Sequence, residues 1–117
     1  MNKFQLTKHF NLREFQCRCC GQVKVDSRLV DKLQMFRYVV GRPIIITSGY
    51  RCPEHNRAVG GAPKSKHMEG IAADIRVEGM TPKQVAELAD KAGFTGIGIY
   101  DNFVHLDIRK DPARWNG

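Results

Sequence analysis

Residues 44–77 read IIITSGYRCPEHNRAVGGAPKSKHMEGIAADIRV, with an apolar run at each end and a loop between the runs. Residues 44–47 are rich in β-branched side chains, which predicts a strand buried on both faces. Residues 49–70 hold four of the eleven glycines and two of the five prolines, so they predict a long loop with one helical turn after Pro53. Residues 71–77 predict a second strand. A long loop in a small domain is often functional, which makes this loop the first candidate for a site.

The segment before this stretch predicts one helix. Residues 27–40 have apolar side chains at helical spacing, with Asp26 or Ser27 as the cap and Gly41 as the end. The apolar residues expected on its buried face are Leu29, Val30, Leu33, Phe36, Val39 and Val40. Residues 1–25 are expected to be irregular, with short apolar anchors at Phe4, Leu6, Phe10, Leu12 and Phe15.

The segment after it predicts a second helix and a hairpin. The helix begins at Thr81, is strengthened by a capping box with Gln84, and stops at Gly93. Residues 96–100 and 103–109 flank a turn and predict two antiparallel strands. The resulting order of elements is helix, strand, loop, strand, helix, strand, strand. This order predicts an α+β fold with helices packed on a largely antiparallel sheet.

The bulk properties limit the possible classes. The 117 residues are enough for one core, so a single domain over residues 1–117 is expected. No apolar run approaches the roughly 20 residues of a membrane helix, and the start of the chain has no apolar segment typical of a secretory signal. We therefore expect a monomer that is cytoplasmic at synthesis and has no membrane partner. The net charge of +7 is spread along the chain, so nucleic acid is not the expected partner.

The four cysteines are Cys17, Cys19, Cys20 and Cys52. The pair Cys17-x-x-Cys20 has the spacing of a structural metal site, but only Cys52 is available as a further ligand outside the cluster. Without an export signal, disulfides are not expected. Reduced thiols near the surface are therefore the prediction, in preference to a metal.

Three residues in and beyond the loop point to a catalytic metal. His67 lies at the end of the loop, Asp74 lies in the apolar run that follows, and His105 lies in an apolar segment near the end of the chain. An aspartate is costly to bury unless a cation or a donor meets it. Two imidazoles and one carboxylate would leave a fourth tetrahedral position for water, as in catalytic zinc sites. On spacing alone, the three residues are explained equally well without a metal, by histidines buried in the core and an ion pair between Asp74 and Arg76.

Five motifs in order resemble the zinc D-Ala-D-Ala peptidases: SGYRCPEHN (48–56), VGG (59–61), SKHMEGIAAD (65–74), GIGIY (96–100) and FVHLD (103–107). The last two match the compact bacterial and phage members of that family. The family shares a fold with the hedgehog signalling domain and a metal site with lysostaphin-type enzymes. The resemblance therefore implies a hedgehog/D,D-peptidase-like fold and a Zn²⁺ cofactor.

The resemblance also implies roles for single residues. His67, Asp74 and His105 match the three zinc ligands. Arg51 matches an arginine aimed at the scissile carbonyl, where a fixed guanidinium can stabilise a developing oxyanion. Ser65 matches a substrate-binding position, although a loop or cap hydroxyl is nearly as good an explanation.

The general base departs from the family pattern. Many relatives carry an acidic residue three positions before the last ligand, where this chain has Asn102. Asp101 is the expected base, because a small change of register would present it. Asp107 is the alternative, and strand alternation places it on the same face as His105, where it would orient that ligand instead.

The sequence thus predicts a zinc peptidase that cuts a stem peptide of peptidoglycan, as a D,D-carboxypeptidase or an endopeptidase. Its action would be on the cell wall, as in a phage-type lysin or a bacterial enzyme. Two rival classes remain. The first is a zinc-containing module that binds the cell wall without cutting it, which the missing base favours. The second is a small nucleic-acid-binding protein, which only the charge favours.

Overall fold

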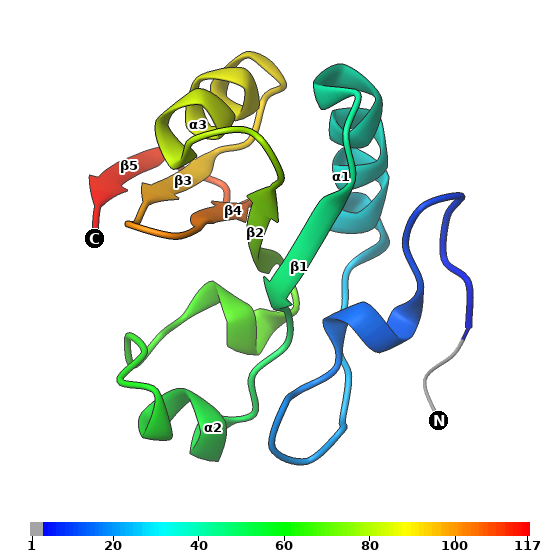
Figure 1. The fold of residues 1–117 in the computed structure, drawn as a ribbon. Helices are drawn as coiled ribbons and strands as arrows, with labels where there is room; N and C mark the ends of the chain where they lie inside the picture. The colour runs from blue at the N-terminus through cyan, green and yellow to red at the C-terminus, as the bar shows by residue number, and fades with distance from the viewer. Residues whose placement is uncertain (1–3) are drawn as a thin grey trace.

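The computed structural model describes residues 4–117, which form a five-stranded sheet with two longer helices on one face (Figure 1). The helices are α1 (Ser27–Val40), α2 (Pro53–Ala58) and α3 (Pro82–Lys91), with 3-10 turns η1 (Leu12–Phe15) and η2 (Lys66–Glu69). The strands are β1 (Ile44–Ser48), β2 (Ala72–Val77), β3 (Gly96–Ile99), β4 (Val104–Asp107) and β5 (Ala113–Asn116). The predicted α+β class is confirmed. Among the described residues, no helix is long and apolar enough to span a bilayer.

Helix α1 has the predicted bounds because its ends are determined locally. The Asp26 side chain accepts a hydrogen bond from the backbone N–H of Arg28 at 2.8 Å, and Gly41 ends the helix at φ 66°. The expected apolar face is buried at Leu29, Val30, Leu33 and Phe36. Val39 is 56% exposed, so its predicted burial is wrong. It lies in the last turn, past the four buried residues.

Helix α3 also begins as predicted. The Thr81 hydroxyl accepts from the backbone N–H of Gln84 at 3.2 Å, and the Gln84 side chain accepts from the N–H of Thr81 at 3.0 Å. This reciprocal pair is the capping box expected from the sequence. The chain turns at Gly93 (φ 92°) and buries Phe94. Phe94 packs edge-on against Phe36 of α1, with ring centroids 5.5 Å apart, and so joins the two helices over the sheet.

The strand order is β1-β2-β4-β3-β5. Strands β3 and β4 form the predicted hairpin, and β2 pairs antiparallel with both β1 and β4. The last strand was not predicted. β5 pairs parallel with β3, which makes the sheet mixed at that edge.

Strand alternation gives the sheet one apolar and one polar face near its centre. Ala73 of β2 pairs with Leu106 of β4, and both belong to the core under the helices. Their neighbours Asp74 and His105 are also paired, and they face the opposite side. The polar side chains that carry the expected chemistry therefore stand together on the face not covered by α1 and α3.

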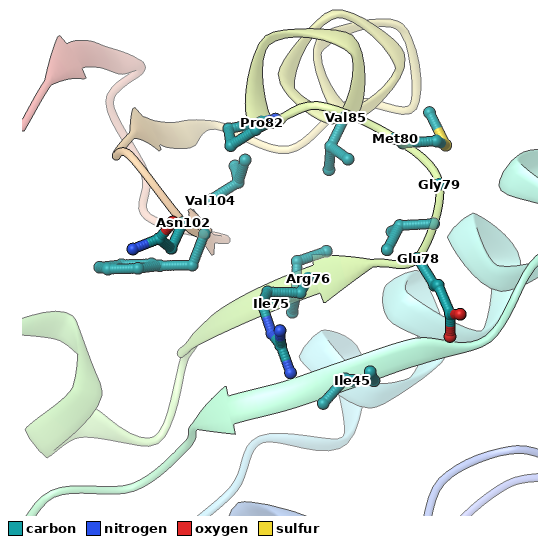
Figure 2. Close-up of a pocket in the computed structure, with 12 residues that line it drawn as sticks. Ile45, Ile75, Arg76, Glu78, Gly79, Met80, Pro82, Val85, Asn102 and Val104 are labelled. Carbon is teal, nitrogen blue, oxygen red and sulfur yellow. The ribbon is translucent and has the colours of Figure 1, made fainter.

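Strand β1 is not buried on both faces, and that prediction is wrong. Ile44 and Ile46 belong to the core, while Ile45 points to the opposite face of the sheet and is 39% exposed. Ile45 pairs with the exposed Arg76. Figure 2 shows both residues beside a cavity of about 370 Å³ that continues towards the start of α3.

The loop between β1 and β2 contains the predicted helical turn after Pro53 and, in addition, the 3-10 turn η2. In the N-terminal segment, Phe10 and Phe15 are buried as expected, but Phe4 is 71% exposed, so its predicted anchoring is wrong. The prediction of surface thiols is wrong for two of the four cysteines. Cys17 and Cys52 are buried because the N-terminal segment packs against the start of α2.

Candidate metal centre

The side chains of His67, Asp74 and His105 converge on the polar face of the sheet. One ligand atom of each lies within 4.8 Å of the others, and all three residues are buried. Turn η2 supplies His67, and the neighbouring strands β2 and β4 supply the other two. Residues separated by up to 38 positions in sequence are thus brought together by one turn and one strand pair.

His67 is held by its backbone and by its own ring. Its backbone N–H donates to Ser65 Oγ at 3.2 Å, which caps η2, and its Nδ1–H donates to the Gly49 carbonyl at 2.7 Å. With the proton on Nδ1, the lone pair of Nε2 points to Asp74 Oδ1, 3.1 Å away. A backbone partner of this kind fixes the tautomer that a metal-binding histidine needs.

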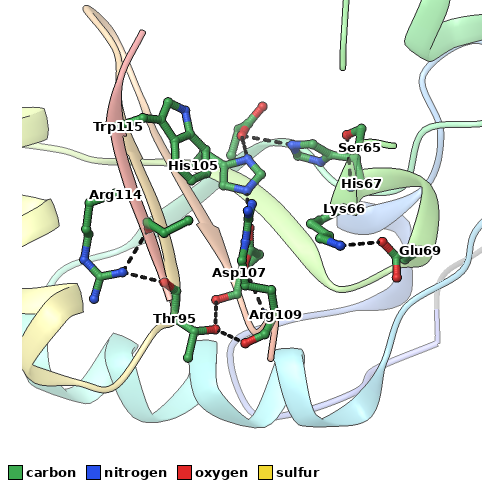
Figure 3. Close-up of polar contacts among 12 residues, drawn as sticks. Ser65, Lys66, His67, Glu69, Thr95, His105, Asp107, Arg109, Arg114 and Trp115 are labelled. Atoms are coloured by element: carbon green, nitrogen blue, oxygen red, sulfur yellow. Dashed lines mark hydrogen bonds and ion pairs between the residues drawn. The ribbon is translucent and has the colours of Figure 1, made fainter. Parts of the chain in front are cut away.

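His105 is oriented by a carboxylate on its own strand. Its Nε2–H donates to Asp107 Oδ2 at 2.7 Å, and its Nδ1 lies 3.2 Å from Asp74 Oδ1. Asp107 has no exposed surface and also accepts from the Arg109 guanidinium, with the shortest contact at 2.6 Å. Figure 3 shows Asp107 and Arg109 together below the His105 ring. Asp107 therefore has the position of a residue that orients His105.

Glycine at two positions of β3 makes room for this arrangement. A Cβ atom on Gly96 would overlap the Asp107 carboxylate, and one on Gly98 would overlap the indole of Trp115. Gly98 is the residue that pairs with His105. The GIGI sequence of β3 is thus required by the side chains of the two strands beside it.

The electrostatics of the centre require a cation between the three residues. In the tautomers fixed by Gly49 and Asp107, two nitrogen lone pairs and Asp74 Oδ1 face one another. Without a metal, protons must occupy this space. Burial raises the pKa of Asp74, but hydrogen bonds from His105 and His67 outweigh it and lower the pKa to about 2.

The pKa of His105 moves the opposite way. Burial lowers it, but the hydrogen bonds to Asp107 and Asp74 outweigh burial and raise it. Together the two shifts favour an ionised Asp74 carboxylate beside a protonated His105 ring.

The donor set fits zinc. With metal–ligand distances of about 2.0–2.2 Å, the edge of a tetrahedron is about 3.3–3.6 Å. The nitrogen–oxygen separations of 3.1 and 3.2 Å to Asp74 are close to that edge. Three protein ligands of the N, N, O type leave one position open, as in catalytic zinc sites.

Arg51 lies directly beside the candidate ligands. Its Nη2 donates to Asp74 Oδ2 at 3.1 Å, its Nε to Ser48 Oγ at 3.2 Å, and its Nη1 to Asn56 Oδ1 at 3.3 Å. The guanidinium is therefore fixed in one orientation next to the centre. Ser65, by contrast, uses its oxygen to cap η2, and only 9% of its surface is exposed.

The centre opens into a cleft of about 510 Å³. Four basic side chains line it: Arg51, Lys64, Lys66 and Arg109. Three aromatic side chains also line it: Tyr100, Phe103 and Trp115. Asp74 has the only carboxylate among the described residues of this lining, but Lys66 and Arg109 pair with the carboxylates of Glu69 and Asp107 beside it. Four cations against three carboxylates leave a small excess of positive charge, which favours an anionic ligand.

The aromatic wall was missed in the sequence. Trp115 lies in β5, its ring centroid is 5.0 Å from that of His105, and its Nε1–H donates to the Tyr100 hydroxyl at 2.9 Å. Arg109 lies over the Trp115 ring at 5.0 Å. The one signal available was a lone tryptophan close after the last predicted strand, which is weak without knowledge of the sheet order.

The predicted base does not join this group. Asp101 is exposed in the turn between β3 and β4 and is not among the residues that line the cleft. Asn102 lines the other cavity instead, where Figure 2 shows it beside Val104. The role of Asp101 stays a prediction.

Comparisons with known proteins agree with this geometry. A family model described as Peptidase M15 matches residues 8–107. The peptidoglycan L,D-endopeptidase MepK of Escherichia coli K12 is 34% identical over 99 residues, covering 77% of this chain and 53% of that protein. The probable MepK of Haemophilus influenzae is 30% identical over 105 residues, covering 80% and 55%. The zinc D-Ala-D-Ala carboxypeptidase of Streptomyces albus G is 40% identical over 67 residues, covering 56% and 26%. The chain spans about half the length of the MepK proteins.

Proposed function

The chain belongs to the peptidase M15 family, and on that premise we propose that it hydrolyses a peptide bond in the stem peptides of peptidoglycan. His67, Asp74 and His105 would hold the zinc ion. The observation that carries the proposal is the convergence of these three buried side chains at the floor of a basic cleft. The names of the relatives, two peptidoglycan endopeptidases and a zinc carboxypeptidase, support the substrate and the metal.

We further propose that residues 1–117 act as a single, monomeric zinc peptidase domain with a hedgehog/D,D-peptidase-like arrangement. The sheet supports this, since its central strands β2 and β4 supply two of the three proposed ligands. The place of action would be the cell wall, with no nucleic-acid or membrane partner.

When bound, zinc would polarise the scissile carbonyl and make a water molecule acidic near neutral pH. The protein's own groups would do the rest. Arg51, fixed by Ser48 and Asn56, would place its positive charge where the carbonyl oxygen becomes negative. A preorganised donor of this kind needs no reorientation during the reaction.

The cleft lining would select the substrate. Lys64 and Lys66 come from the loop and Arg109 follows β4, so positive charge lies on two sides of the centre. Stem peptides carry carboxylates, which these cations would bind. Ser65 is retained as a proposed substrate contact at the edge of η2, in addition to its cap.

Asp101 is the proposed proton acceptor, and it would reach the cleft only if the turn between β3 and β4 moves. Asp101→Asn tests this role. A fall in kcat with unchanged zinc content supports it, and an unchanged kcat assigns the proton transfer to another group.

The absence of any carboxylate except Asp74 from the described lining favours one rival, a zinc module that binds the cell wall without cutting it. Incubation with murein and defined stem peptides decides between the two, with products identified by mass spectrometry. Release of D-alanine indicates carboxypeptidase activity, and cleavage between an L- and a D-residue indicates L,D-endopeptidase activity. Binding without products supports the rival.

The matched pair of variants for this experiment is Asp74→Ala and Asp31→Ala. Asp31 is exposed on α1 and is not among the residues that line the cleft. The zinc equivalent of this centre and product release should both be lost in Asp74→Ala and retained in Asp31→Ala. Full zinc content in Asp74→Ala would contradict the ligand set.

A further inference from the structure

A second group of metal-ligand type lies away from the cleft, where all four cysteines of the chain meet. Their sulfur atoms lie within 4.8 Å of one another. The Sγ–Sγ distances are 3.6 Å for Cys17–Cys19, 3.7 Å for Cys17–Cys52 and 3.3 Å for Cys19–Cys52. Three of the cysteines come from one short turn, and the fourth comes from the start of α2, 35 positions after Cys17.

These distances fit a shared metal ion better than a disulfide. A disulfide has a sulfur–sulfur distance of about 2.05 Å, and all four cysteines are free. Four thiolates around a zinc ion at about 2.3 Å form a tetrahedron with edges of about 3.8 Å. The observed separations of 3.3–3.7 Å are near that edge.

The backbone around the cluster is arranged for thiolates. The N–H of Cys52 donates to Cys17 Sγ at 3.5 Å, and the N–H of His55 donates to Cys52 Sγ at 3.4 Å. The turn that carries the other sulfurs is closed by a hydrogen bond from the Cys17 N–H to the Gln22 carbonyl at 2.6 Å. Gly21 permits this tight turn because its φ is 73°.

We propose that Cys17, Cys19, Cys20 and Cys52 bind a second zinc ion with a structural role. All four positions would be filled by protein sulfur, as in closed structural sites, whereas the His67–Asp74–His105 centre leaves one open. The inference stands on the cysteine geometry alone and does not depend on the proposed peptidase activity.

The position of the cluster indicates what this ion would stabilise. Cys52 caps α2 and directly follows Arg51, which contacts Asp74. The N-terminal segment already meets this loop through a hydrogen bond from the Tyr50 N–H to the Phe15 carbonyl at 2.8 Å. A zinc ion bound by the four cysteines would connect the same N-terminal segment to this loop a second time, at Cys52 (Figure 1). It would thereby hold the backbone that positions Arg51.

Cobalt(II) titration of the chelator-treated, reduced full chain tests the proposal. Thiolate-to-cobalt charge-transfer absorption arises only from sulfur ligands, so the His67–Asp74–His105 centre is silent in this measurement. We expect one equivalent of cobalt to give the band in the wild type and in Asp74→Ala. We expect the band to be lost in the double variant Cys17→Ser/Cys52→Ser.

A second variant is needed because Cys17 and Cys52 are buried, so the double variant could lose the band by misfolding. Cys20 is exposed, so Cys20→Ser should keep the native circular dichroism while its cobalt affinity falls at least about tenfold, as loss of one ligand implies. Zinc analysis of the protein purified in reductant should give two ions per wild-type chain and one in Asp74→Ala.

Three results would overturn the proposal. The first is four titratable free thiols in a wild-type chain that gives no cobalt band. The second is a pair of disulfides that persists after purification in reductant. The third is iron, in place of the second zinc, at one equivalent per chain.

Discussion

Asp107→Asn is the most informative substitution at the candidate centre, because it keeps the shape of a side chain that touches no metal. Asp107 accepts four donor groups: His105 Nε2–H, the Arg109 backbone N–H, and Arg109 Nε and Nη2. Oδ1 faces the Arg109 N–H groups, and Oδ2 faces both His105 and Arg109. An amide NH₂ on either side would therefore meet a donor.

The tautomer of His105 determines the consequence. If the NH₂ group faces His105, Nε2 must accept, so the ring proton moves to Nδ1, the atom that faces Asp74. That nitrogen then has no lone pair for a metal. Loss of such a supporting carboxylate typically lowers metal affinity about 10–100-fold, which is about 1.4–2.7 kcal/mol.

Competition with a chromophoric zinc chelator measures the zinc affinity of this centre. The zinc ion that the wild type binds and Asp74→Ala does not bind is assigned to the centre. The affinity should fall by the stated factor in Asp107→Asn and stay unchanged in Asp31→Asn, the exposed counterpart on α1. The reasoning is refuted if Asp107→Asn is folded and binds zinc as tightly as the wild type.

Three further predictions follow from the same contacts. In the metal-free protein the pKa of Asp74 is lowered from 3.8 to about 2, so the stability that its carboxylate contributes is complete above about pH 4 and is lost as the pH falls towards 2. Urea unfolding midpoints measured against pH should show this loss, and Asp74→Asn should flatten the dependence of the midpoint on pH. Gly96→Ala should cost about 1–3 kcal/mol in urea unfolding, because the added Cβ overlaps Asp107, and an unchanged midpoint would contradict the packing. Arg51→Lys should retain zinc but lower kcat about 100-fold or more, since the ammonium cannot keep all three hydrogen bonds; unchanged kcat would remove Arg51 from the mechanism.

The parts of the fold that were predicted correctly depend on local signals. Asp26 and Gly41 bound α1, and the Thr81–Gln84 capping box starts α3, through contacts within a few residues. The hairpin of β3 and β4 is likewise local. The family and its zinc cofactor, which the resemblance implied, are confirmed by the M15 match and by the zinc carboxypeptidase among the relatives.

The parts that were missed depend on non-local pairing. β5 has only four residues, so its alternating sequence ARWN is too short to predict a strand, and its partner β3 is known only once the sheet is assembled. Trp115 therefore gave no sign that it would line the cleft. The exposure of Ile45 likewise depends on which face of the sheet is covered, which only the assembled fold shows.

The candidate site shows the same division. Residue chemistry placed His67, Asp74 and His105 in one metal hypothesis, the resemblance favoured it over the alternatives, and the structure brings the three together. Strand alternation predicted that Asp107 could orient His105, and the structure shows that contact. The contact of His67 with the Gly49 carbonyl depends on the geometry of the loop, which the sequence does not display.

The most direct test of the central claim is anomalous X-ray scattering at the zinc edge from crystals of the purified protein. One peak should lie within bonding distance of His67 Nε2, Asp74 Oδ1 and His105 Nδ1. A zinc-loaded protein whose anomalous map has no peak between these three atoms would contradict the account.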